Sequence, residues 1–381
     1  MPFHVHLDRP PAGVAAAAGR NGEDIPIAYR EFTSSEDGDT FISRLEGFPA
    51  TILGLLDANP PIKPSTVDHL VAVIQPTGAT DVYINELTVL GKARIRKAVE
   101  KGDLLLDGDI VDIEELRFEG LDIPSNAGVL VLVSQGWRKG LFFDFGPLLP
   151  NPIQREFDLS KLLGSLFSYL TFQQYFKITD DEWDALLQAG WFPFVGMERE
   201  TLNLLLTHVR NSWNPDDLVP EVAAKLNNRL DELQKSWRSQ TLLAPHIDIL
   251  ARALERFRAE DYLSATAILY PRIEGILRDM HARSGGTSFK QALLAQAPLT
   301  AIAERAHQYS RLLPTRFRRF LETVYFASFS PSTTAPLSRH SVAHGVAPAE
   351  LFSTKAATLG ILIVEQLCFH APPPETVPPA A

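Results

Sequence analysis

The chain has 381 residues, of which 45% are hydrophobic and 22% are charged, so it is long enough for two or three domains with buried cores. Its formal net charge of −10 argues against nucleic-acid binding by the whole protein, and its single cysteine, Cys368, excludes an intramolecular disulfide and a cysteine-based zinc site. No segment approaches the ~20 apolar residues that cross a bilayer, and the start lacks the pattern of a secretory signal, so we expect a cytoplasmic protein without a membrane partner.

The first 155 residues predict an irregular segment followed by a small domain. Proline and glycine interrupt residues 1–62, so we expect an irregular arm there, with one short helix over residues 40–57. Residues 63–155 contain short runs rich in β-branched and aromatic residues, which predict a small α+β domain. Its strands are expected at residues 70–74, 81–84, 110–118, 128–134 and 140–145, the last two as a hairpin, with a helix over residues 93–103.

The rest of the chain is predicted to be helical. Apolar residues recur every three or four positions from residue 158 onward, a spacing typical of amphipathic helices. We interpret residues 156–239 as a helical connector and residues 240–370 as an all-helical domain. Helices are expected at residues 159–170, 180–188, 219–237, 246–258, 262–283, 288–295, 314–326 and 349–370. The proline-rich residues 371–381 are expected to be disordered.

The charge is unevenly distributed between these parts. Residues 240–370 carry a net charge of +4, whereas residues 1–239 carry −13. An acidic front part and a mildly basic back part indicate separate tasks.

The strongest candidate for chemistry is the segment LSRHSVAHG, residues 337–345. Arg339 is followed after four residues by His344, and a second histidine, His340, comes directly after the arginine. On a continuous helix Arg339 and His344 are about 7.5 Å apart along the axis and about 140° apart around it, so we expect them not to touch but to reach one cleft. A histidine serves as an acid or a base near neutral pH, and a guanidinium suits phosphate oxygens.

This segment resembles the motif of HEPN domains, which are helical bundles with an arginine, four to six residues and a histidine. Residues 268–278 (ILYPRIEGILR) resemble the long second helix of that family, where an inward glutamate, here Glu274, commonly lies. The resemblance covers residues 240–370 only. It implies an α+β protein in which a small N-terminal α+β domain and a helical connector precede a HEPN-like all-α bundle.

The resemblance also implies a function. HEPN nucleases are metal-independent endoribonucleases that need no cofactor and act as homodimers, here through the C-terminal domain. His344 would be the acid or base, Arg339 the phosphate stabiliser, and His340 and Glu274 the orienting groups, with a 2′,3′-cyclic phosphate as the product. Bacterial stress, toxin–antitoxin or antiphage-defence effectors are the expected setting, with the acidic front part receiving a trigger or a regulatory partner.

Alternative interpretations of the same residues stay open at this point. The bundle could be a catalytically inactive dimerisation or adaptor module in which Arg339 and His344 only stabilise the fold. Glu274 could form a structural salt bridge, for example to Arg339. His340 and His344 lie four residues apart on one helical face, a spacing that permits a zinc site.

A second candidate is the segment RLLPTRFRRF, residues 311–320, in which Arg311, Arg316, Arg318 and Arg319 interleave with two phenylalanines. Arginine contacts to phosphates and aromatic stacking on bases suit single-stranded RNA. The structural alternative is a solvated helix face whose phenylalanines enter the core. The chain contains no phosphate-binding loop, no dinucleotide-binding glycine motif and no nucleophile elbow.

Overall fold

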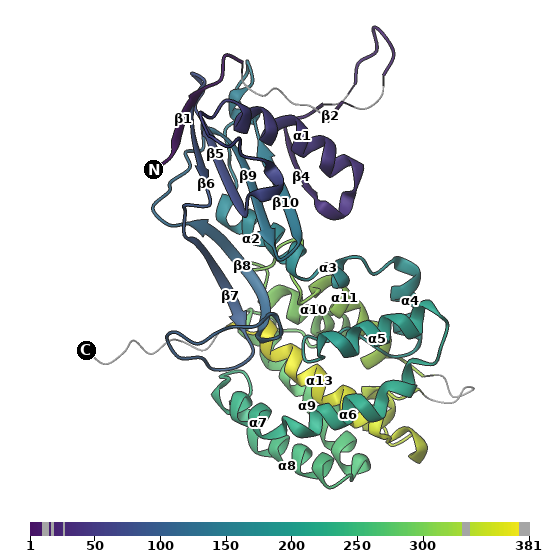
Figure 1. The fold of residues 1–381 in the computed structure, drawn as a ribbon. Coiled ribbons are helices and arrows are strands. Elements are labelled where there is room, and N and C mark those ends of the chain that lie inside the picture. The colour runs from purple at the N-terminus through teal and green to yellow at the C-terminus, as the bar shows by residue number, and fades with distance from the viewer. Residues whose placement is uncertain (10–14, 17–18, 26, 330–335, 373–381) are drawn as a thin grey trace. The chain divides into compact units, whose positions relative to one another are not determined.

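The computed structural model describes residues 1–9, 15–16, 19–25, 27–329 and 336–372. Strands dominate the first part of the chain and helices the rest, which confirms the predicted α+β class (Figure 1). The chain forms two compact units. Unit 1 comprises Met1–Ala93 and Ile113–Gln173, and unit 2 comprises Arg94–Asp112 and Gln174–Ala381.

Unit 1 is built on a six-stranded antiparallel sheet with the strand order β1-β6-β5-β9-β10-β4. The strands of this sheet are β1 (Phe3–His6), β4 (Arg30–Ser34), β5 (His69–Ile74), β6 (Ala79–Ile84), β9 (Gly128–Gln135) and β10 (Arg138–Asp144). The central strands β5 and β9 are almost continuously apolar, because both of their faces are covered. The predicted hairpin is the pair β9–β10.

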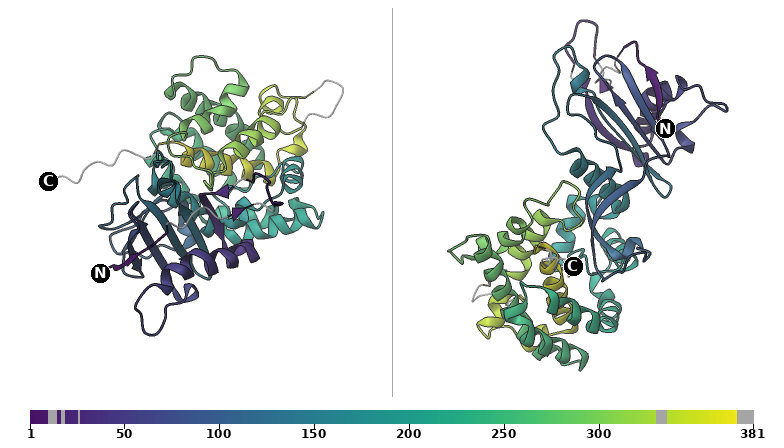
Figure 2. Two further views of the ribbon diagram at one scale, coloured as in Figure 1. Left: turned by 90° about the horizontal axis from the view of Figure 1, so that it is seen from above. Right: turned by 90° about the vertical axis from the view of Figure 1, so that its left-hand side faces the viewer.

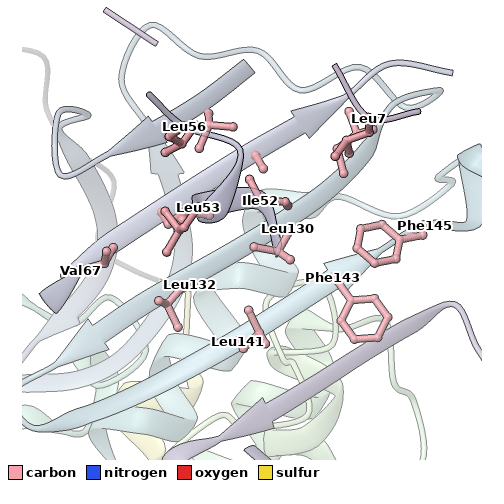
Figure 3. Packing of buried hydrophobic residues seen from close by; sticks show 14 of the residues in the cluster. Leu7, Ile52, Leu53, Leu56, Val67, Leu130, Leu132, Leu141, Phe143 and Phe145 are labelled. Atoms are coloured by element: carbon pink, nitrogen blue, oxygen red, sulfur yellow. The ribbon is translucent and has the colours of Figure 1, made fainter. Parts of the chain in front are cut away.

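Two helices cover the two faces of this sheet. Helix α1 (Asp39–Gly54) contributes Ile52 and Leu53 to a core that also holds Leu132, Leu141 and Phe143 of the sheet (Figure 3). Helix α2 (Leu159–Thr171) contacts β9 and β10, and its side chains meet residues that alternate with those facing α1. Successive side chains along each strand therefore pack alternately against α1 on one face of the sheet and against α2 on the other.

Two expectations for the front part are wrong. The segment predicted as an irregular arm, residues 1–62, supplies the strands β1 and β4 to the sheet of unit 1, whereas the helix expected within it over residues 40–57 is present as α1. Its edge strands are short, and β1 pairs with distant residues (Phe3 with Val82), so local pattern does not reveal them. The helix predicted over residues 93–103 is also wrong, because strand β7 (Val89–Ile95) continues into it and pairs with β8 (Ile110–Phe118).

Unit 2 is helical apart from its parts of β7 and β8. Its helices are α4 (Asp180–Gln188), α5 (Arg199–Arg210), α6 (Val219–Asn228), α7 (Leu230–Ser239), α8 (Ile247–Arg258), α9 (Tyr262–Arg283), α10 (Gln291–Ala301), α11 (Pro314–Phe320), α12 (Arg339–Ala343) and α13 (Thr354–His370). A short helix α3 (Gln173–Phe176) begins at the unit boundary, and a π-helical turn (Leu321–Tyr325) follows α11. Nearly all residues of α13 are buried, and Figure 2 shows this helix, in yellow, among the other helices of unit 2.

The predicted division into a connector (residues 156–239) and a separate C-terminal domain (residues 240–370) is wrong. Helix α2 belongs to unit 1, whereas the other helices of the expected connector share one unit with α8 to α13. A buried carboxylate on α13, Glu365, pairs with Arg229 at 2.6 Å, and the amide of Val195 donates to Gln366 at 3.0 Å. Breaking such a buried ion pair is costly, so these contacts hold both parts in one core.

The predicted disorder of residues 371–381 concerns a segment that, from residue 373 on, is outside the described residues. Among the helices that are described, none combines the length and apolar character needed to cross a membrane.

Candidate functional site

The candidate motif forms helix α12, a single short helix with defined ends. Ser338 is its N-cap: its hydroxyl accepts from the amide of Ser341 at 3.3 Å, and its own amide donates to Ser341 Oγ at 3.0 Å. Gly345, with φ of +67°, ends the helix in the left-handed conformation that glycine adopts readily. A five-residue helix has little stability of its own, so these caps and its packing on α9 place its side chains.

Arg339 is anchored to a buried carboxylate. Its Nε forms an ion pair with Oε2 of Glu274, which lies on α9 and is 6% exposed. The other oxygen, Oε1, accepts two hydrogen bonds from Arg278, at 2.9 Å from Nε and 2.7 Å from Nη2. The salt bridge that the sequence offered as an alternative role for Glu274 is therefore present, and it includes a second arginine four residues along α9.

The two histidines lie side by side at the surface. His340 is half-buried and His344 is exposed, and their rings are nearly parallel, 3° apart in orientation and 6.1 Å apart between centroids. The side-chain nitrogens of His340 (Nε2) and Gln291 meet, and the His344 ring lies 6.3 Å from that of Phe329. The expectation that the two histidines share one helical face agrees with this geometry.

A pocket of about 450 Å³ opens at these rings. Among the described residues, its walls are Ser328, Phe329, His340, His344 and Val346. The volume falls within the range typical of small-ligand sites. An apolar rim and two imidazoles are thus presented together to an incoming molecule.

The surroundings of His340 keep its imidazole neutral. Burial lowers its pKa, the charge of Arg339 and the neighbouring His344 lower it further, and the carboxylate of Glu274 opposes them. Because the ordinary pKa of histidine is about 6.5, the lowered value leaves this ring deprotonated at pH 7. A neutral imidazole in a pocket is suited to accept a proton.

The structure corrects the expected arrangement of the pair. Arg339 and His344 were predicted to reach one cleft, but the described pocket walls hold His340 with His344, while Arg339 extends to Glu274. The reason is the buried carboxylate of Glu274 on α9, which binds the guanidinium and which the spacing within the motif does not reveal. The side chain of Arg339 is 24% exposed, and its guanidinium anchors α12 to α9 beside the pocket.

The arginine-rich segment does not form an open basic groove. Arg311 is 4% exposed, donates to Ile110 O at 2.7 Å and Tyr175 OH at 2.7 Å, and stacks on the Tyr175 ring. Phe317 and Phe320 are buried in the core, as the structural alternative for this segment expected. The remaining arginines form ion pairs at 2.6 to 2.8 Å: Arg316 with Asp180, Arg318 with Glu322 and Arg319 with Asp184. Its predicted role as an RNA-binding surface finds no support in this geometry.

Sequence reasoning missed several residues of the site. Arg278 was detectable, because it lies four residues after Glu274 on the same predicted helix. Gln291 and Phe329 come from other segments, and nothing in the local pattern indicates that they meet α12, whereas Val346 directly follows the motif. For the zinc alternative, no group of three or more His, Cys, Asp or Glu side chains suited to hold a metal ion occurs within the described ranges.

Comparison with known proteins adds no relative to this picture: no protein-family model matches the chain, and neither curated proteins nor solved structures give a match.

Proposed function

We propose that the region around α12 is a metal-independent endoribonuclease of the HEPN type. The observation that carries the proposal is the pair of parallel imidazoles, His340 and His344, on the wall of one open pocket. Beside the pocket stands Arg339, held in place by Glu274. RNA cleavage by its own 2′-hydroxyl requires a base, an acid and a positive charge near the phosphate, and these residue types supply all three.

The two histidines divide the proton transfers. His340, kept neutral by its surroundings, takes the proton of the 2′-hydroxyl as its oxygen attacks phosphorus. His344, the more exposed ring, gives a proton to the departing 5′-oxygen. The products are a 2′,3′-cyclic phosphate and a free 5′-hydroxyl, so no redox partner or added nucleophile is needed. The guanidinium of Arg339 contributes positive charge to the field at the phosphate.

A second copy of the chain is the proposed partner. In the family that the motif resembles, two copies present their motifs to one cleft, and the partly apolar pocket rim, with Val346 45% exposed, is a surface that a second copy can cover. In this proposal the acidic unit 1 receives the trigger or regulatory partner of a bacterial stress, toxin or antiphage effector.

The test uses the full chain and end-labelled single-stranded RNA in the presence of a metal chelator. His344→Ala is expected to lower the cleavage rate at least about 100-fold, because positioned acid–base groups contribute that much. Thermal unfolding and dimerisation are expected to stay at the wild-type level. His4→Ala is the matched control, since that imidazole is 75% exposed and lies in unit 1. Equal cleavage by wild type and His344→Ala would remove the proposal.

One observation favours a second candidate, a non-enzymatic dimerisation or adaptor module. Arg339 and Arg278 both bind Glu274, and an ion cluster of this kind stabilises packing between α9 and α12 without any chemistry. Under this candidate the wild-type chain cleaves no RNA, and Arg339→Met, which removes an ion pair of this cluster, lowers thermal stability. The cleavage and unfolding measurements described above therefore separate the two functions.

A further inference from the structure

A second cavity lies in unit 2 apart from the α12 pocket. Its volume is about 520 Å³, and its walls come from α3, α4, the end of α10 and the segment that leads into α11. Cavities of this size bind small organic molecules in other proteins. Part of its wall is the arginine-rich segment that the sequence singled out and that the ribonuclease proposal leaves without a role.

Aromatic rings from three separate segments meet at this cavity. Phe176 and Tyr309 pack edge to face with centroids 5.4 Å apart, while Tyr175 and Trp183 are almost fully buried behind the surface that they present. The two buried rings support the wall, and the half-buried rings of Phe176 and Tyr309 present part of their π surface to the cavity. Such surfaces suit a planar heteroaromatic ring, because stacking on them tolerates different bases.

The polar groups of the cavity favour an anion. Arg316 lies on its wall, with its guanidinium 5.1 Å above the ring of Trp183. Its ion-pair partner, Asp180, is 84% exposed, so this surface pair is weak and can yield to a stronger anionic ligand. His307, with its side chain 11% exposed and its Nε2 4.0 Å from a carboxylate oxygen of Asp112, adds an imidazole to the same wall.

The segment between α10 and α11 is built to hold its shape. Buried Asp112 accepts from Ser310 Oγ at 2.5 Å and from the amide of Arg311 at 3.1 Å. Leu313 then adopts a left-handed conformation with φ of +49°, which a residue with a β-carbon adopts only where the surroundings impose it. A site whose walls are fixed before binding loses less entropy when a ligand enters.

From these contacts we propose that the cavity is a binding site for a free nucleoside monophosphate. The base stacks on the ring of Tyr309 and contacts Phe176 at its edge, and the phosphate binds Arg316, with His307 as a further hydrogen-bonding group. The aromatic wall selects the base, Arg316, the one arginine or lysine among the described wall residues, selects one phosphate, and the volume accommodates both. The site is independent of the ribonuclease proposed at α12 and stands if that activity is absent.

The experiment is isothermal titration of the full chain with AMP, GMP, CMP and UMP, and separately with adenosine, inorganic phosphate and an RNA oligonucleotide without terminal phosphates. At least one monophosphate is expected to bind about tenfold or more tightly than adenosine or phosphate alone, because hydrogen bonds to charged groups are the strong ones. Arg316→Gln is expected to remove that advantage while leaving the affinity for adenosine unchanged.

Two further variants test the stacking. Tyr309→Ala is expected to weaken binding of both nucleotide and nucleoside, and Tyr309→Phe, which keeps the ring, restores it. Arg252→Gln is the control, because that arginine lies on α8 with its side chain 73% exposed. The affinity of this variant for the nucleotide is expected to equal the wild-type value. Absence of binding by every monophosphate, unchanged affinity in Arg316→Gln and Tyr309→Ala, or binding of the oligonucleotide alone would each overturn the proposal.

Discussion

Removing the charge of Glu274 tests how α12 is held. The carboxylate is 6% exposed and binds two arginines, and Glu274→Gln keeps its size while abolishing both ion pairs. Breaking a fully buried ion pair costs about 3–5 kcal/mol. Because the side chain of Arg339 is 24% exposed, we expect a smaller coupling of about 1–2 kcal/mol between Glu274 and Arg339. Arg278 is 44% exposed, so its coupling to Glu274 is expected near 0.5 kcal/mol.

The measurement is a pair of double-mutant cycles. Glu274→Gln is combined with Arg339→Met in one cycle and with Arg278→Met in the other, and the free energy of unfolding comes from urea denaturation followed by far-ultraviolet circular dichroism. The methionines retain the aliphatic stems, so the cycles isolate the charge interaction. A coupling of about 0.3 kcal/mol or less between Glu274 and Arg339 would refute the anchoring role, because that value is within the error of additivity.

Two further predictions concern stability elsewhere in unit 2. Burial lowers the pKa of His370 to about 4 in the folded chain, whereas an unfolded histidine has a pKa of about 6.5. As pH falls below 6.5, the unfolded chain therefore binds a proton at this residue and the folded chain does not. The contribution of His370 to the free energy of unfolding is fully present above pH 6.5 and falls by about 3 kcal/mol between pH 6.5 and 4. Over this range His370→Phe is expected to lose about 3 kcal/mol less than wild type in urea denaturation, and parallel curves would contradict this. Glu260, exposed and with φ of +59°, follows the end of α8 in a left-handed conformation. Glu260→Gly is expected to raise the free energy of unfolding by about 0.5–1 kcal/mol, and a lower melting temperature than that of Glu260→Ala would count against this.

Elements with strong local signals were predictable from the sequence. The bounds of α9 and β8 agree with the structure, because a long apolar period and a run of β-branched residues determine them locally. The expected helix over residues 219–237 is instead interrupted at Arg229, whose guanidinium turns to Glu365 on α13. That partner is distant in sequence, so no local pattern indicates the break. The edge strands of unit 1 and the boundary between the units also depend on contacts that are distant in sequence, so they were not predicted either.

The sequence singled out polar residues of the candidate site but not their orientation. The motif identified the residues of α12, and the helical pattern of α9 indicated an acid at Glu274. Which of the three polar side chains faces a pocket depends on how a short helix is rotated against its neighbours. Phe329 lines the pocket and Gln291 contacts His340, and both belong to segments that sequence spacing does not connect with α12.

Because Arg339 lies outside the pocket, the motif combines an anchoring residue with two residues of the pocket wall. Arg339 fastens α12 to the buried Glu274, while His340 and His344 lie on the pocket wall. Since so short a helix cannot hold its own position, the parallel arrangement of the two rings depends on that fastening. If the ribonuclease proposal is correct, Glu274→Gln therefore lowers cleavage even though Glu274 is not among the described pocket walls, and Arg278→Met lowers it much less. A carboxylate that served only the bulk stability of unit 2 would leave the cleavage rate of the folded variant unchanged.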